Sequence, residues 1–164
     1  MIKYFFVSIF TDQSLNEYLW IVGGQNQDNV KLNTSEFVYL NKKSVEGPTL
    51  NLEFLFGHCM VKLNDSAIFI IGGDNGKITS SEGFLPTADF QTWIVDPTNE
   101  FKFTEGPKLN EVRYDSACGK YEDSGKTKLI VAGGYRYGNG EMYSVETLDP
   151  SSPNNVWQYG KEIF

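Results

Sequence analysis

Three short apolar runs, each followed by a pair of glycines, recur along the chain. They read LWIVGG at 19–24, AIFIIGG at 67–73 and LIVAGG at 129–134. Each run is too short for a helix, and its β-branched and aromatic residues favour a strand. Because the runs do not alternate between apolar and polar residues, we expect both faces of each strand to be covered.

The glycine pairs are predicted to have a structural role. Glycine adopts positive φ without strain, and its missing Cβ lets a neighbouring backbone approach closely. The aromatic residue of the last short strand, in VWQYG, is expected to pack in the core. The structural residues predicted in this way are Gly23, Gly24, Gly72, Gly73, Gly133, Gly134 and Trp157.

The segments around the three runs also repeat. A strand-like segment with a polar turn precedes each run, and a loop rich in Gly, Asn and Asp follows it. A third strand then ends near Asn41, Asp96 and Asp149, and a short fourth strand comes after it. Four short antiparallel strands per unit, repeated with a period near ~50 residues, are typical of β-propeller blades. The predicted fold is all-β, with blades at 1–48, 54–107 and 113–160.

Composition restricts the possible functions. The chain of 164 residues is 40% hydrophobic and 21% charged, which suits one globular domain. Its net charge is −7 and it has two arginines, so neither nucleic acid nor an anionic membrane is expected as a partner. The apolar start lacks a signal-peptide cleavage pattern, and a cytoplasmic location is predicted.

The residues that could support catalysis are few. One histidine, His58, cannot provide the ligand set of a copper oxidase, and two cysteines with that histidine cannot form a zinc site without carboxylates. Nothing in the sequence brings His58 and Cys118 together as a base and a nucleophile. Cys59 and Cys118 are interpreted as buried free thiols in a reducing compartment. We expect no catalytic residue, metal or cofactor.

The ordered set of these features resembles the kelch repeat family. It comprises the three Gly-Gly pairs, SVETLDP followed by Trp157, DPTNEF, the two Gly-Pro closures and the hairpin GHCMVKLND. The resemblance implies a kelch-type propeller that binds proteins, and one context is substrate recognition for a cullin-based ubiquitin ligase adaptor with a BTB domain. An actin-associated scaffold is an alternative, and a fragment of a galactose oxidase-like propeller enzyme is an alternative of another class.

In the kelch family, the loops that join second to third strands and fourth to first strands emerge on one face, which commonly binds protein partners. Tyrosine and arginine are enriched at interface hot spots, which draws attention to the GYRYGNG loop at 134–140. The expected partner-binding residues on this face are Asp74, Asn75, Arg113, Tyr135, Arg136 and Tyr137.

Three blades are too few for a closed propeller, because four is about the smallest ring that propellers form. An open half-ring would expose more apolar surface than a monomer usually tolerates. Either the chain is a fragment of a longer propeller, which the sequence favours, or two copies complete a six-bladed ring as a homodimer.

Overall fold

A computed structural model describes the chain at residues 6–11, 17–28, 30–39, 44–50, 55–74, 91–136 and 138–161. The described part contains strands, turns and loops. It holds no helix that could cross a membrane.

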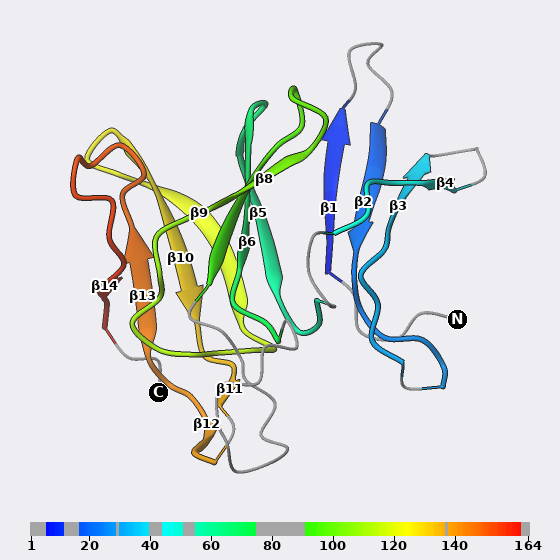
Figure 1. The fold of residues 1–164 in the computed structure, drawn as a ribbon. Helices are drawn as coiled ribbons and strands as arrows, with labels where there is room; N and C mark the ends of the chain where they lie inside the picture. Colours follow the sequence, from blue (N-terminus) through cyan, green and yellow to red (C-terminus); the bar gives the residue numbers. More distant parts are fainter. Residues whose placement is uncertain are drawn as a thin grey trace.

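The strands form three four-stranded antiparallel sheets in chain order (Figure 1). The first sheet consists of β1 (Phe6–Thr11), β2 (Glu17–Val22), β3 (Ser35–Tyr39) and β4 (Val45–Glu46). The second consists of β5 (Cys59–Asn64), β6 (Ala67–Ile71), β7 (Thr92–Asp96) and β8 (Lys102–Glu105). The third consists of β9 (Ala117–Asp123), β10 (Lys126–Ala132), β13 (Val145–Leu148) and β14 (Gln158–Tyr159).

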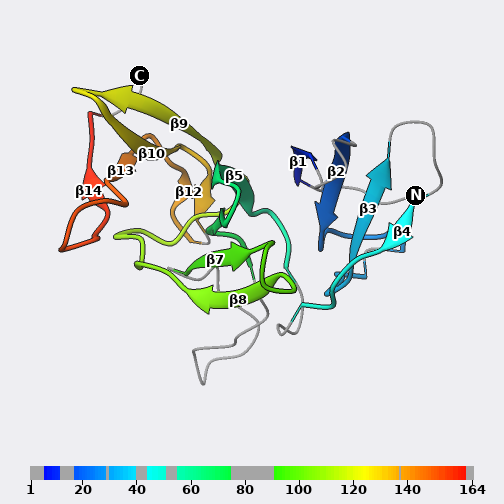
Figure 2. The ribbon, with the colours of Figure 1, turned by 90° about the horizontal axis from the view of Figure 1, so that it is seen from above.

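A small hairpin of β11 (Tyr135–Arg136) and β12 (Gly140–Glu141) is inserted between β10 and β13. The sequence pattern predicts a loop at this place, and the structure shows that the loop contains a two-stranded hairpin. The three large sheets stand side by side, and the first and third sheets do not meet (Figures 1 and 2). The all-β prediction is confirmed, and the arrangement is compatible with a β-propeller-like fold whose ring is not closed.

Two hydrophobic clusters hold adjacent sheets together. The cluster between the first and second sheets is built around Trp20, whose ring centroid lies 5.0 Å from that of Phe101. Between the second and third sheets, Phe69 and Ile71 of β6 pack with Leu129 of β10 and with Trp157. The indole Nε1 of Trp157 donates to the carbonyl oxygen of Pro107 at 3.1 Å, which joins the two sheets through a polar contact as well.

Burial along the second strand of each sheet shows which faces are covered. In β6 the four residues from Ile68 to Ile71 are all buried, as expected for a strand that is covered on both faces. In β2 and β10 buried and half-buried positions alternate instead. The prediction of two covered faces is therefore wrong for β2 and β10, because each of these sheets packs against only one neighbouring sheet.

Cys59 of β5 and Cys118 of β9 form a disulfide, with their Cα atoms 6.0 Å apart. The bond ties the first strand of the second sheet to the first strand of the third. The interpretation of these residues as free thiols is thus corrected. It failed because the packing of the two sheets brings together cysteines that are 59 residues apart in the sequence.

The glycine pairs adopt the same backbone conformation in all three sheets. The first glycine of each pair has φ between 59° and 65°, and the second has φ between 91° and 100°. The second glycine also binds the next sheet, since the N–H of Gly24 donates to the carbonyl of Leu55 at 2.7 Å, and the N–H of Gly73 donates to that of Arg113 at 2.9 Å. A Cβ on Gly72 would lie 2.5 Å from the carbonyl oxygen of Arg113. Close approach of adjacent sheets therefore depends on the missing side chains.

Replacing Gly72 by alanine should destabilise the protein by more than 3 kcal/mol, because the positive φ costs about 1–2 kcal/mol and the clash with backbone adds to it. Gly125→Ala is the matched control, since Gly125 has φ of 77° but no atom within 4 Å of the added Cβ. Gly125→Ala should cost only the φ term, about 1–2 kcal/mol. Urea denaturation of both variants measures the difference, and equal losses would contradict the close approach.

Candidate functional site

The candidate site is the edge of the sheets where the chain leaves each glycine pair. Short bridges extend the strands beyond this point, with Phe56 pairing to Asp74 and Tyr114 pairing to Tyr135. Loops from all three sheets reach this edge, which lies at the bottom of Figure 1 together with β11 and β12. We refer to it as the loop edge.

Asp74 lies inside the loop edge and not on its surface. Asp74 is 1% exposed, and its carboxylate accepts a hydrogen bond from Lys31 Nζ at 2.7 Å. Lys31 comes from the loop of the first sheet, and its Nζ also lies 5.4 Å from the ring centroid of Phe56. The expected surface position of Asp74 is therefore wrong, because the carboxylate joins the loops of two adjacent sheets.

Arg113 is fully buried between the second and third sheets. Its Nη1 donates to the carbonyls of Gly133 and Ser144 at 2.9 and 3.0 Å, and its Nη2 donates to Glu146 Oε1 at 3.0 Å. Glu146 is fully buried as well, and its other oxygen accepts two hydrogen bonds from Asn110 at 2.7 and 2.8 Å. The expected partner-contacting position of Arg113 is wrong, because the guanidinium group satisfies backbone carbonyls and a carboxylate inside the protein.

Among the described residues, the exposed tyrosines of the loop edge lie on and next to the β11–β12 hairpin, while the loop of the first sheet exposes Val30. Tyr135 is 41% exposed, and its ring packs on Tyr114 with centroids 5.4 Å apart. Tyr143 is 57% exposed, and its hydroxyl donates to Glu141 at 3.3 Å. Arg136 is half-buried on the same hairpin. We call Tyr135, Arg136, Glu141 and Tyr143 the hairpin patch.

Two further expected residues, Asn75 and Tyr137, lie outside the described residues. Sequence reasoning missed Tyr143, although its neighbourhood offered a signal. The glycines at 138 and 140 flank Asn139, and such a Gly-Asn-Gly turn between tyrosines is typical of a hairpin. Sequence reasoning also missed Glu146, whose carboxylate is the buried partner of Arg113.

His58 is buried just before β5, and burial lowers its pKa from 6.5 to about 3. The neutral imidazole is therefore the form that the folded protein contains at neutral pH. Cys118 is held in the disulfide, so it offers no thiol to a base. Among the described residues, no three His, Cys, Asp or Glu side chains gather as a metal site requires.

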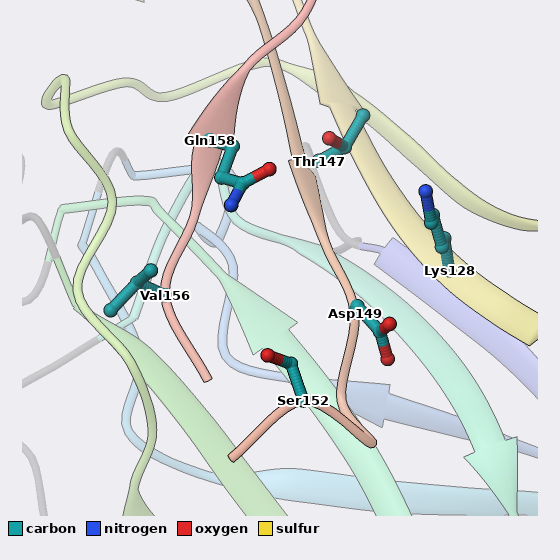
Figure 3. Close-up of a pocket in the computed structure, with 6 residues that line it drawn as sticks. All are labelled: Lys128, Thr147, Asp149, Ser152, Val156 and Gln158. Carbon is teal, nitrogen blue, oxygen red and sulfur yellow. The ribbon is translucent and has the colours of Figure 1, made fainter. Parts of the chain in front are cut away.

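A second candidate site is a shallow hollow of about 140 Å³ on the outer side of the third sheet (Figure 3). Its lining is mostly polar, and two of its charged groups are already paired. Lys128 binds Asp123, and Asp149 accepts a hydrogen bond from Lys126 at 3.1 Å. The residues that line the hollow are Lys128, Thr147, Asp149, Ser152, Val156 and Gln158.

Comparison with known proteins shows the fold and no family. No protein-family model matches the sequence. No curated protein matches it either. Among solved structures, the chain is similar to the structure of YjhT, with a TM-score of 0.71 and 12% identity. It is also similar to a chain in the cryo-EM structure of RAG in complex with one melted RSS and one unmelted RSS, with a TM-score of 0.68 and 11% identity. In both cases 99% of this chain aligns with 52% of the other, so it spans about half their length.

Replacing Arg113 by methionine should destabilise the protein by about 3–5 kcal/mol, because it leaves the Glu146 carboxylate buried without its cation. The same substitution at Arg136 is the matched control and should change stability by less than about 0.5 kcal/mol, as surface changes do. Denaturant unfolding measures both. Similar stability of the two variants would show that the guanidinium of Arg113 is not part of the core.

Stability should fall as the pH is lowered through 6.5, because the unfolded chain then binds a proton at His58 that the folded protein does not bind until about pH 3. The contribution is fully present above pH 6.5, and about 1–2 kcal/mol of it is lost between pH 6.5 and 5. His58 is the only histidine, so His58→Gln should flatten this part of the profile. An unchanged slope in urea titrations across that range would contradict a buried neutral imidazole.

Proposed function

We propose that the chain is a protein-protein interaction module of the kelch type, built from three propeller blades, and that it binds its partner through the hairpin patch. The observation that carries the proposal is the exposure of Tyr135 and Tyr143 next to Arg136 on a hydrogen-bonded hairpin. Tyrosine and arginine are the residue types that dominate interface hot spots.

The contacts beneath the patch support this role. Tyr135 pairs with Tyr114 through two backbone hydrogen bonds, of 3.1 and 2.8 Å, and through their rings, so the patch is held in place before a partner arrives. Preorganisation lowers the entropic cost of binding. Loops positioned by a rigid scaffold are the usual location of binding residues. The four members of the patch carry one positive and one negative charge, which suits a partner of mixed polarity.

The two cellular contexts that the kelch resemblance implies depend on the compartment in which the chain resides. Substrate recognition for a cullin-based ubiquitin ligase adaptor, or an actin-associated scaffold, would require the cytoplasm. The disulfide between Cys59 and Cys118 weighs against a cytoplasmic location, because disulfides persist mainly in oxidising compartments. We therefore propose protein recognition without either context.

Arg136→Ala should weaken the partner complex at least ~10-fold while leaving the melting temperature nearly unchanged, because a hot-spot arginine contributes more than about 1.4 kcal/mol to binding. The partner is first identified by affinity capture with the wild-type chain and then purified, and its affinity is measured by calorimetry. Lys102→Ala is the control, because Lys102 is exposed on the outer strand β8, away from the loop edge.

Loss of binding together with a large drop in melting temperature would assign Arg136 to the scaffold and contradict the proposed patch. Equal affinity of wild type and Arg136→Ala would contradict it as well. Tyr135→Ala is less suitable as the first variant, since it also removes the ring contact with Tyr114.

A further inference from the structure

The first and third sheets each have one face that points away from the second sheet. Alternation along the strands and the strand registers fix which residues share these faces. The first end face, on the first sheet, carries Glu17, Leu19, Ile21, Glu36, Val38 and Glu46. The second end face, on the third sheet, carries Tyr121, Asp123, Lys126, Lys128, Ile130, Thr147 and Gln158.

Repeat-matched positions show that both end faces lack the cover that the same positions have inside the stack. Counted back from the glycine pair, Leu19 and Ile21 match Ile68 and Ile70. The latter two are fully buried against the first sheet, whereas Leu19 and Ile21 are only half-buried. On the opposite side, Ile130 matches Phe69, which is 3% exposed, and Ile130 is again half-buried.

At the second end face a backbone N–H group also lacks, within the described residues, the partner that its counterparts have inside the stack. Gly24 and Gly73 are buried and donate their N–H groups to the next sheet. Gly134 holds the same place in the third sheet with φ of 100°, but it is half-buried, and no acceptor for its N–H lies among the described residues. A backbone donor of this kind is normally paired when it is buried. The N–H of Gly134 is therefore the counterpart, at the end of the third sheet, of the two N–H groups that bind the next sheet at Gly24 and Gly73.

The two end faces are of opposite types, so one can dock on the other. The first end face corresponds to the side of β6 that meets the preceding sheet, and the second corresponds to the side that meets the following sheet. A contact between unlike faces is heterologous, and it closes into a ring when the rotation allows. The 52% coverage of the similar structures means that two copies of this chain match the length of one such chain.

We propose that a second copy of this chain docks its first end face on the second end face of this one, and the reverse, so that two copies close a ring of six sheets. Both contacts are then equivalent. The apolar rows at Leu19 and Ile21 of one copy cover Ile130 of the other. The hollow beside Lys128 and Thr147 lies on the second end face and offers room for a side chain of the partner copy.

Charge favours this pairing over a contact between like ends. On the first end face Glu36 and Glu46 stand directly opposite each other on β3 and β4, and like charges in that position are destabilising. The second end face carries Lys126 and Lys128, with Asp123 directly opposite Lys126. Each lysine already contacts an aspartate, and Lys126 keeps 59% of its side chain exposed. In the ring of six sheets, the face that carries these lysines meets the face that carries the glutamate pair of the other copy.

The test uses charge reversal at the two ends. Light scattering after size exclusion should give the wild-type chain a mass of about 37 kDa, twice the 18.5 kDa of one chain. Variant X, Glu36→Lys with Glu46→Lys, and variant Y, Lys126→Glu with Lys128→Glu, should each run as monomers because their ends repel. An equimolar mixture of X and Y should return to the dimer mass, since both of its contacts then pair opposite charges.

Circular dichroism of X and Y checks that each remains folded. Lys102→Glu with Glu105→Lys, on the outer strand β8, is the control and should leave the dimer intact. A wild-type chain that is monomeric or polydisperse overturns the proposal. So does a dimer that neither X nor Y disrupts, or two monomeric variants whose mixture stays monomeric.

Discussion

The structure depends on how closely one sheet can approach the next at the glycine pairs. The second glycine donates its N–H to a carbonyl at the start of the following unit. Gly24 donates to Leu55 between the first and second sheets, and Gly73 donates to Arg113 between the second and third sheets. We call these two contact regions the first and second joints. A side chain at Gly72 would collide with that same carbonyl of Arg113. Because the approach is fixed by backbone, the apolar strands before the glycines stack on one another, and their facing side chains form the two hydrophobic clusters.

Charged groups at the joints follow from this close approach. Chain segments that reach from one sheet to the next leave carbonyls in the interior, and buried carbonyls require donors. Arg113 meets that requirement at the second joint, where its own carbonyl accepts from Gly73 while its guanidinium group binds two carbonyls and Glu146. Lys31 and Asp74 connect the loops at the first joint. The ion pairs at the two joints connect residues that are 43 and 33 positions apart in the sequence.

Sequence reasoning recovered the strands and the glycine pairs, because both depend on local features: apolar runs of fixed length and a residue that tolerates positive φ. It did not recover the Cys59–Cys118 disulfide or the burial of Arg113, since both depend on which strands face each other across a joint. It could not separate Arg113 from Arg136 either. Both arginines were expected on the same loop face. Only the packing of the sheets shows that Arg113 lies inside the protein and Arg136 on a hairpin.

The division between joints and hairpin indicates where function can reside without cost to the fold. Residues at a joint satisfy buried groups on two sheets, so any change there alters stability together with binding. The β11–β12 hairpin contacts the scaffold through the pair of Tyr135 and Tyr114, and the exposed Tyr143 donates a hydrogen bond to Glu141 of the hairpin. Substitution within the hairpin patch can therefore change the proposed binding surface while the stack of sheets stays the same, as is usual for binding loops on a rigid scaffold.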